Sequence, residues 1–314
     1  MSLVSLGCNN FGGHPTTAPN GTVYGALDLA QTREVVHAAL DAGINLFDTA
    51  DVYATGGSER FLGEILRGHR QQVVIATKWG SGIEPGQAIA WGSRAYIRQA
   101  IDASLQRLQT DYIDLYQLHW PDPLTPIAET IDALDELARE GKLRFTGSSH
   151  FTGQQVIEAD RYARGTGKLR FNAAQNHYSL LERSAESELL PACAERGVGL
   201  LPYFPLANGL LAGKYRRGVA AVGRLAGREI GADVFDLIEA LAAYALARGR
   251  TMVDVAVGAL AARAAVSSVI TGATRPEQIR INAAAADWQP TADDLAQLGA
   301  LLKAHPVTAA HVQA

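Results

Sequence analysis

Short apolar runs alternate with segments of helical periodicity along almost the whole chain. The runs are rich in valine, isoleucine, leucine and aromatic residues and are mostly continuous, which is typical of strands covered on both faces. They lie near 3–7, 44–48, 72–78, 112–119, 143–148, 170–175, 197–203 and 266–271. Between them, apolar residues recur three and four positions apart, which predicts amphipathic helices. We expect these helices at 32–42, 58–67, 93–108, 127–140, 152–164, 183–196, 233–248, 252–264, 275–287 and 292–304.

This alternation predicts an α/β fold. Eight strands, each followed by a helix, give the (β/α)8 TIM barrel, with two additional helices near the end of the chain. No linker-like composition divides the sequence, so residues 1–314 are expected to form a single barrel domain. Long connections at about 8–31, 79–92 and 204–232 follow predicted strands one, three and seven. In a barrel such connections lie on the face where active sites form.

Composition excludes several classes of protein. The 314 residues are 47% hydrophobic and 19% charged, as in ordinary globular proteins. A net charge of −4 gives no basic surface for nucleic acid or an anionic membrane. No apolar run approaches the roughly 20 residues that span a bilayer, and the first residues lack a secretory signal, so a cytoplasmic protein is expected. Cys8 and Cys193 form no disulfide framework and the histidines no zinc motif, so no metal is expected.

Four polar side chains stand at or just past the ends of three predicted strands: Asp48, Tyr53, Lys78 and His119. Reduction of a carbonyl by hydride leaves an alkoxide that must receive a proton. A free tyrosine, with a pKa of about 10, is too weak an acid, but a nearby cation stabilises the phenolate. Lys78 could supply that cation with Asp48 holding it, and His119 could orient the carbonyl oxygen. These side chains therefore predict a reductase site.

Each of the four residues also has an ordinary structural explanation. A strand-ending aspartate often forms a turn, a tyrosine is often half-buried packing, and lysines after strands are usually solvated. A lone histidine near a tryptophan is more often structural than catalytic. What favours catalysis is that all four occur at the same end of consecutive strands, which a parallel barrel gathers at one mouth.

A series of short motifs runs in order along the chain, beginning with DTADVY at 48–53. The series continues through GSERFLG at 57–63, KW at 78–79, LHWP at 118–121, GSSHF at 147–151, QNHY at 175–178, YFPLA at 203–207 and GATRPEQ at 272–278. Together these motifs resemble the aldo-keto reductase superfamily, including its longer-loop branch and potassium-channel β subunits. The resemblance implies that Asp48, Tyr53, Lys78 and His119 form a catalytic tetrad, with Tyr53 as general acid and base.

The sequence contains neither a Rossmann GxGxxG after a strand nor a complete phosphate loop. The resemblance instead implies NADP(H), bound in an extended pose across the barrel mouth, with NAD as the other possibility. It implies nicotinamide contacts from Ser149, His150 and Gln175, and a stacking contact from Tyr203. It further implies phosphate contacts from Lys214 and Arg224. The other residues expected at the cofactor are Cys8, Asn9, Asp48, Phe204, Pro205, Leu206, Ala207, Asn208, Gly272, Thr274, Arg275, Gln278 and Asn282.

Two positions depart from the family pattern. The family usually has asparagine where this chain has His150, and some branches have lysine at the position of Gly272. Arg275 is then the remaining candidate for a 2′-phosphate, because a guanidinium matches phosphate geometry. Arg275 could equally be a solvated residue in the first turn of a helix.

The leading hypothesis is an NADP(H)-dependent reductase that acts on a small aldehyde or ketone. An alternative is a nucleotide-sensing regulatory subunit, since the channel β subunits resemble this tetrad but have asparagine in place of His119. A third is a barrel isomerase or aldolase with Lys78 as a Schiff base. The sequence leaves the substrate and the oligomeric state open. The substrate pocket is predicted to include Phe11, Tyr53, Trp79, Trp91, His119 and Trp120.

Overall fold

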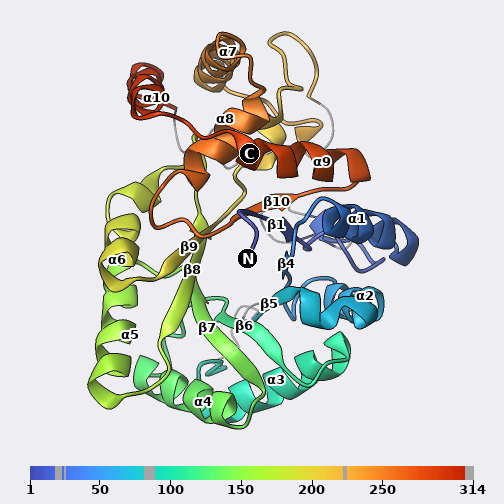
Figure 1. Cartoon of the computed structure of the whole chain (residues 1–314), viewed down its shortest axis with the longest axis vertical. Coiled ribbons are helices and arrows are strands. Elements are labelled where there is room, and N and C mark those ends of the chain that lie inside the picture. Colours follow the sequence, from blue (N-terminus) through green and yellow to red (C-terminus); the bar gives the residue numbers. More distant parts are fainter. Residues whose placement is uncertain (18–22, 25, 81–88, 222–224, 308–314) are drawn as a thin grey trace.

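The computed structural model describes residues 1–17, 23–24, 26–80, 89–221 and 225–307, and this part contains a closed barrel of parallel strands (Figure 1). The barrel closes because β1 pairs with both β4 and β10. Around it run β1 (Val4–Gly7), β10 (Val269–Gly272), β9 (Gly199–Tyr203), β8 (Phe171–His177), β7 (Leu143–Ser149), β6 (Ile113–Leu118), β5 (Val74–Trp79) and β4 (Leu46–Asp48). All eight strands that the sequence predicts are present.

Helices surround the barrel, as Figure 1 shows. The helices that accompany the strands are α1 (Leu29–Asp41), α2 (Gly57–Ile65), α3 (Arg94–Leu108), α4 (Ile127–Arg139), α5 (Gly153–Thr166), α6 (Leu189–Arg196), α8 (Met252–Ala261) and α9 (Pro276–Ala284). The two additional helices are α7 (Ala232–Leu246) and α10 (Ala292–Ala304). The predicted (β/α)8 barrel with two extra helices is therefore confirmed.

Several helices start where a polar side chain can satisfy their first backbone amides. Asp28 caps α1, and the side chain of Gln31 bonds back to the amide of Asp28. The same reciprocal capping box begins α5 at Thr152, α8 at Thr251 and α10 at Thr291. Each such cap is worth about 1 kcal/mol of helix stability.

The predicted element boundaries need three corrections. The helix expected at 183–196 is a short 3-10 turn, η2 (Ser184–Glu186), followed by α6, because Glu188 interrupts the helical backbone with a ψ of −50° at a φ of −132°. The helix expected at 275–287 ends at Ala284 and continues as the 3-10 turn η5 (Ala285–Asp287). The connection expected at 204–232 contains a 3-10 segment, η3 (Ala207–Ala212).

Further short elements lie between the barrel strands. A two-stranded antiparallel ladder of β2 (Thr16–Thr17) and β3 (Val23–Tyr24) follows β1, and a 3-10 turn, η1 (Arg67–Gln72), precedes β5. None of the described helices is both long and apolar enough to cross a membrane.

A layer of apolar side chains fills part of the barrel. It consists of Leu46, Ala76, Leu115, Ala173, Leu201 and Ile270, one from each of six strands. Side chains on a strand alternate between its two faces, so the residue two positions later points the same way. The residues two positions past this layer are Asp48, Lys78, Gln117, Gln175, Tyr203 and Gly272. The strand period thus places a polar layer directly above the apolar one, toward the carboxyl ends of the strands.

A second apolar cluster lies outside the barrel, under the additional helices. It joins α7, α8 and α10 to η3 through residues such as Leu210, Leu237, Ala256 and Leu298. Figure 1 shows these helices gathered on the side of the barrel formed by β9, β10 and β1. This packing anchors the connection that follows β9.

Candidate active site

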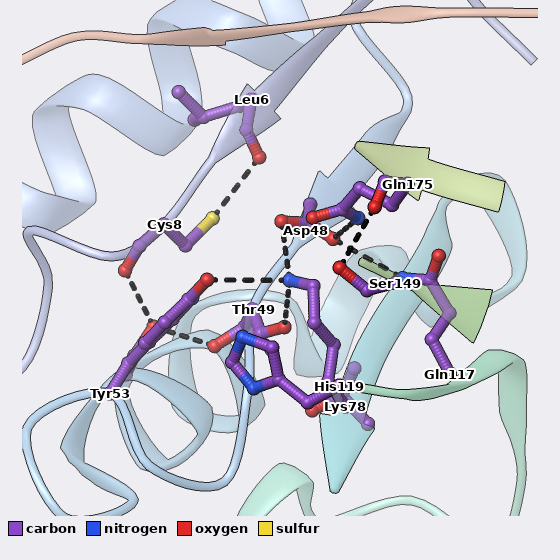
Figure 2. A network of polar contacts seen from close by, with 12 residues as sticks. Leu6, Cys8, Asp48, Thr49, Tyr53, Lys78, Gln117, His119, Ser149 and Gln175 are labelled. Carbon is purple, nitrogen blue, oxygen red and sulfur yellow. Dashed lines mark hydrogen bonds and ion pairs between the residues drawn. The ribbon is translucent and has the colours of Figure 1, made fainter. Parts of the chain in front are cut away.

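Lys78 lies at the centre of the polar layer (Figure 2). Its ammonium Nζ donates to Asp48 Oδ2 at 2.7 Å and to the Thr49 carbonyl oxygen at 2.9 Å. It also lies 3.4 Å from the Tyr53 hydroxyl oxygen. The Lys78 side chain is fully buried and Asp48 is 3% exposed. The carboxylate of Asp48 thus compensates the buried charge of Lys78. The third contact of the Lys78 ammonium group is with the hydroxyl of Tyr53.

Asp48 is fixed from the other side by amide side chains. Gln175 Nε2 donates to Asp48 Oδ1 at 2.8 Å, and Gln117 Nε2 approaches the same oxygen at 3.5 Å. The Ser149 hydroxyl donates to the backbone carbonyl of Gln175 at 2.9 Å. A buried carboxylate with both oxygens hydrogen-bonded stays in one rotamer, so it holds Lys78 in a fixed position.

The loop between β4 and α2 carries Tyr53 to Lys78. Ala54, Thr55 and Gly56 all have left-handed backbone conformations, with φ of 49°, 53° and 77°. The loop after β1 packs against Ala54 at Gly12. A Cβ atom built on Gly12 would lie 2.3 Å from the Cβ of Ala54, so only glycine allows this close contact. These tight turns fold the chain back on itself directly after Tyr53.

Hydroxyl groups beneath the loop fix it to β1. Thr49 Oγ1 donates to Ser58 Oγ at 2.8 Å, and Ser58 Oγ donates to the carbonyl oxygen of Cys8 at 2.8 Å. The amide of Cys8 in turn donates to the carbonyl oxygen of Asp48 at 2.8 Å. The Gly57–Ser58 pair therefore supports the tyrosine loop rather than contacting the reacting atoms.

His119 lies across from Tyr53, and its ring meets the phenol ring edge to face with centroids 6.0 Å apart. It is 7% exposed. Burial lowers the pKa of His119 well below its usual value, and the nearby Lys78 and His150 lower it further. His119 is therefore a neutral imidazole at neutral pH, which can donate a single hydrogen bond.

His150 connects several aromatic residues at this site. Its Nδ1 lies 2.8 Å from the carbonyl oxygen of His119, and its Nε2 lies 3.0 Å from the Tyr203 hydroxyl. Burial lowers the pKa of His150 to about 4, so the ring is neutral. Because the carbonyl can only accept, Nδ1 carries the proton and Nε2 accepts from Tyr203. The ring also stacks on Trp120, with centroids 3.5 Å apart and an interplanar angle of 7°.

The backbone explains why few residue types suit position 150. His150 has a φ of 60°, in the left-handed region where asparagine and histidine are enriched among the side-chain-bearing residues. The amide of His150 donates to the carbonyl oxygen of Gln175 at 3.1 Å, which fixes that conformation. Histidine here occupies a position that the backbone makes suitable for asparagine as well.

Replacing His150 tests its two hydrogen bonds. We expect His150→Phe to keep the stacking on Trp120 but to lower the free energy of unfolding by about 1–3 kcal/mol, because two partly buried hydrogen bonds are lost. Chemical denaturation measures this value, with His177→Phe as the matched aromatic control. Equal stability of wild type and His150→Phe would contradict the assigned bonds.

The residues predicted to hold the cofactor follow one another across four neighbouring strands. Ser149 ends β7, Gln175 lies on β8, Tyr203 ends β9 and Gly272 ends β10. Beyond β10 comes α9, which begins with a proline at its first turn and has no side-chain cap on its amides. The positive end of a helix dipole favours an anion, although Pro276 has no amide hydrogen and the Gln278 amide donates to the carbonyl oxygen of Arg275 at 3.1 Å. These residues form a continuous strip from β7 to α9.

Some of these residues already have partners inside the protein. Gln175 bonds to Asp48, Asn282 Nδ2 donates to the Gly272 carbonyl oxygen, and Gln278 Oε1 accepts from the Thr274 amide. Tyr203 stacks on His177 with centroids 5.4 Å apart. Several side chains that are predicted to contact the cofactor are therefore held in one orientation by contacts within the protein.

The connection after β9 contains the predicted phosphate-loop residues. It begins at Phe204, Pro205 and Leu206, and Ala207, Asn208 and Gly209 then follow with left-handed backbones. The side chain of Lys214 is exposed and lies close to the backbone of Gly209 in this turn. A Cβ atom built on Gly209 would be only 3.1 Å from Cε of Lys214. Arg224 lies outside the described residues. Arg275 and Thr274 are exposed at the start of α9.

Cys8 and Asn9 follow β1. Cys8 is fully buried, and burial raises the pKa of its thiol well above the usual value. Asn9 is partly buried. Cys8 contributes its backbone to the site, through the bonds to Asp48 and Ser58, and its thiol donates to the carbonyl oxygen of Leu6.

The predicted substrate pocket divides into two groups. Trp120, which directly follows His119, is 47% exposed, and Trp91 is partly buried. The indole N–H of Trp79 donates to the carbonyl oxygen of Trp91, and the indole N–H of Trp91 donates to the carbonyl oxygen of Trp120. Phe11 and Trp79 are fully buried. Trp79 stacks on Tyr116 with centroids 4.4 Å apart. The structure therefore places Phe11 and Trp79 in the hydrophobic core, where they offer no surface to a substrate.

Four residues in the site were not found by sequence reasoning. Thr49 accepts from Lys78, Gln117 approaches Asp48, Ser58 supports the loop and His177 stacks on Tyr203. The alternation rule could have found Gln117, because it lies two residues before His119 on the same strand face. The same rule points to His177, which lies two residues past Gln175 on β8 and pairs in register with Tyr203. The contacts of Thr49 and Ser58 depend on the folded loop after β4.

Comparison with known proteins agrees with this geometry. Residues 4–303 match the model of the Aldo/keto reductase family. The NADH-specific methylglyoxal reductase of Escherichia coli is 36% identical over 304 residues, covering 91% of this chain and 90% of that protein. A probable voltage-gated potassium channel subunit beta of Arabidopsis thaliana is 35% identical over 279 residues, covering 84% of each.

A more similar but shorter match and a solved structure complete the comparison. The aldo-keto reductase YhdN of Bacillus subtilis is 42% identical over 201 residues, covering 63% of this chain and 59% of that protein. The crystal structure of an aldo/keto reductase from Klebsiella pneumoniae in complex with NADP and acetate superposes with a TM-score of 0.72 at 30% identity, covering 98% of this chain and 92% of that one.

The (β/α)8 barrel carries a buried Asp–Lys pair beside a tyrosine and a histidine at the carboxyl ends of its strands. The chain belongs to the aldo/keto reductase family. Membership of this family supports the conclusion that the protein is an oxidoreductase.

Proposed function

We propose that the protein is a nicotinamide-dependent reductase that converts a small aldehyde or ketone to an alcohol, with NADPH as the preferred cofactor. The observation that carries this proposal is the position of the Lys78 ammonium, 2.7 Å from Asp48 and 3.4 Å from the Tyr53 hydroxyl. We also propose that residues 1–314 act as one barrel domain, and that it works in the cytoplasm.

In the proposed mechanism, Tyr53 delivers a proton to the carbonyl oxygen. The bound nicotinamide would supply the hydride. Lys78 stabilises the phenolate that forms when Tyr53 gives up its proton, because an ammonium group within hydrogen-bonding reach offsets the new negative charge. Asp48 keeps Lys78 in place, and the neutral His119 donates a hydrogen bond that orients the carbonyl. Burial of Lys78 and Asp48 excludes water and strengthens each of these interactions.

The same chain offers residues for the rest of the cofactor. Tyr203 presents a flat ring, Ser149 and Gln175 provide polar groups at the nicotinamide end, and Lys214 lies by the left-handed turn at Asn208. Arg275, at the N-cap of α9, would hold a 2′-phosphate by bidentate hydrogen bonds. The Klebsiella structure in complex with NADP supports this cofactor, whereas the NADH-specific Escherichia coli relative supports the other.

Arg275 provides a test of cofactor preference. We expect Arg275→Ala to lower kcat/KM for NADPH about 10- to 100-fold, the worth of hydrogen bonds to a charged group, and to leave kcat/KM for NADH unchanged. Turnover of a small aldehyde, followed by nicotinamide absorbance, measures both values. Arg280→Ala, an exposed arginine on the same helix, is the matched control. Equal losses with both cofactors would remove the argument for NADPH.

The similarity to a potassium channel subunit favours one further candidate function, a nucleotide-binding regulatory subunit with little turnover. The two functions differ in one measurable property. A regulatory subunit would bind NADPH tightly and reduce no aldehyde or ketone in a broad panel. The proposed reductase would turn over at least one class of these substrates.

A further inference from the structure

A cavity of about 380 Å³ lies between the loop after β4 and helix α3. Its polar lining comes from Asp51 and Thr55 on the loop and from Tyr96, Gln99 and Arg107 on α3. Its lining residues include none of the tetrad, although the loop is the one that carries Tyr53. The volume is within the range of small-molecule sites, which is about 300–1,000 Å³.

The charges around this cavity are not balanced. Glu59 is fully buried, and its Oε2 accepts from Arg107 Nε at 2.6 Å. Arg107 Nη2 donates to Ser104 Oγ at 3.1 Å. Asp51 Oδ1 is buried and, among the described residues, has no hydrogen-bond partner. The guanidinium is thus used by Glu59, and the second carboxylate, Asp51, has no cation bound to it within the described part of the chain.

We propose that this cavity binds a small organic cation, whose ammonium group pairs with the carboxylate of Asp51. The remaining lining suits such a ligand. The Thr55 hydroxyl and the Gln99 amide oxygen can accept hydrogen bonds from an ammonium group. The Tyr96 ring offers an aromatic face for a cation–π contact. The apolar part of the lining, which includes Ala100 and Ala103, can cover a short alkyl chain.

The proton is the natural competitor of this cation. Burial, together with the Glu59 carboxylate, raises the pKa of Asp51 to about 7, while Arg107, a backbone hydrogen bond from Val52 and Lys78 oppose the shift. A cation binds only the ionised carboxylate. Affinity should therefore be roughly tenfold weaker at pH 6 than at pH 8, the ratio of the ionised fractions for a carboxyl that titrates near 7.

The cavity is connected to the tetrad through the backbone. The amide of Asp51 donates to the carbonyl oxygen of Lys78 at 3.0 Å, and Tyr53 follows two residues later. An occupant that orders Asp51 therefore acts on the loop that positions the tyrosine. This inference goes beyond the proposed reductase function and does not depend on it.

Calorimetric titration with butylammonium chloride tests the proposal. We expect wild type to bind butylammonium about tenfold more tightly at pH 8 than at pH 6, whereas KCl at the same ionic strength and uncharged 1-pentanol give no comparable binding. Asp51→Asn is isosteric and uncharged, so it should lose the binding. Asp41→Asn, an exposed aspartate at the end of α1, should bind like wild type.

Thermal unfolding gives an independent readout. The pKa of Asp51 is higher in the folded protein than in the unfolded chain, so ionisation of Asp51 lowers the free energy of unfolding. This loss of stability is absent below about pH 4 and reaches its full size above about pH 7. Asp51→Asn should therefore melt at a higher temperature than wild type at pH 8 and at the same temperature near pH 4, and butylammonium should narrow the gap at pH 8. Butylammonium binding that survives in Asp51→Asn, equal binding of K⁺, or no binding to wild type would each overturn the proposal.

Discussion

Tyr53→Phe is expected to lower kcat by about 10²–10⁴-fold, the usual contribution of a positioned proton donor. The variant removes one hydroxyl, which lies 3.4 Å from Lys78 Nζ, and leaves the ring and its edge-to-face contact with His119 in place. The hydride can still be offered, but the alkoxide receives no proton from the protein. Turnover of a small aldehyde, followed by nicotinamide absorbance, measures the loss.

A matched tyrosine separates this effect from the general loss of a hydroxyl. Tyr162 donates to Asp132 Oδ1 at 3.0 Å on the outside of the barrel, between α5 and α4. Tyr162→Phe should keep full activity, and Tyr53→Phe should keep the wild-type affinity for the nicotinamide nucleotide. Wild-type turnover in Tyr53→Phe would show that another group delivers the proton.

The barrel and the tetrad could be predicted because both follow from local patterns. Strands buried on both faces appear as continuous apolar runs, and a parallel barrel gathers their carboxyl ends at one mouth. Asp48 and Lys78 each lie two positions past an inward apolar residue, Leu46 and Ala76. The alternation of side chains along a strand therefore brings them together, whatever the loops do.

The parts of the site that could not be predicted depend on contacts between distant segments. Gln175 was expected at the nicotinamide, yet its side chain bonds to Asp48, 127 positions away in sequence. His150 departs from the family pattern, and only the folded chain shows that it bonds to both His119 and Tyr203. Phe11 lies in a loop, and an aromatic residue in a loop does not show in sequence which way its side chain points. Trp79 instead ends β5, where it follows the inward-pointing Lys78 and therefore lies on the opposite face of the strand, in the main hydrophobic core.

Glu59 joins the two sites that the structure contains. It is fully buried on α2, where Oε1 accepts from Thr77 Oγ1 at 2.6 Å and Oε2 accepts from Arg107 Nε at 2.6 Å. Thr77 directly precedes Lys78 on β5, while Arg107 lines the cavity beside Asp51. The carboxylate thus fixes α2, α3 and β5 to one another.

Glu59→Ala is therefore expected to destabilise the protein by about 3 kcal/mol. This value is at the low end for removing one partner of a buried ion pair, because the Arg107 side chain is 23% exposed and keeps a path to water. Chemical denaturation measures the change. Glu64→Ala is the control, since Glu64 on the same helix pairs with Arg33 at 2.7 Å on the surface, where such pairs contribute little. Equal stability losses in the two variants would show that the Glu59 network does not hold these elements together.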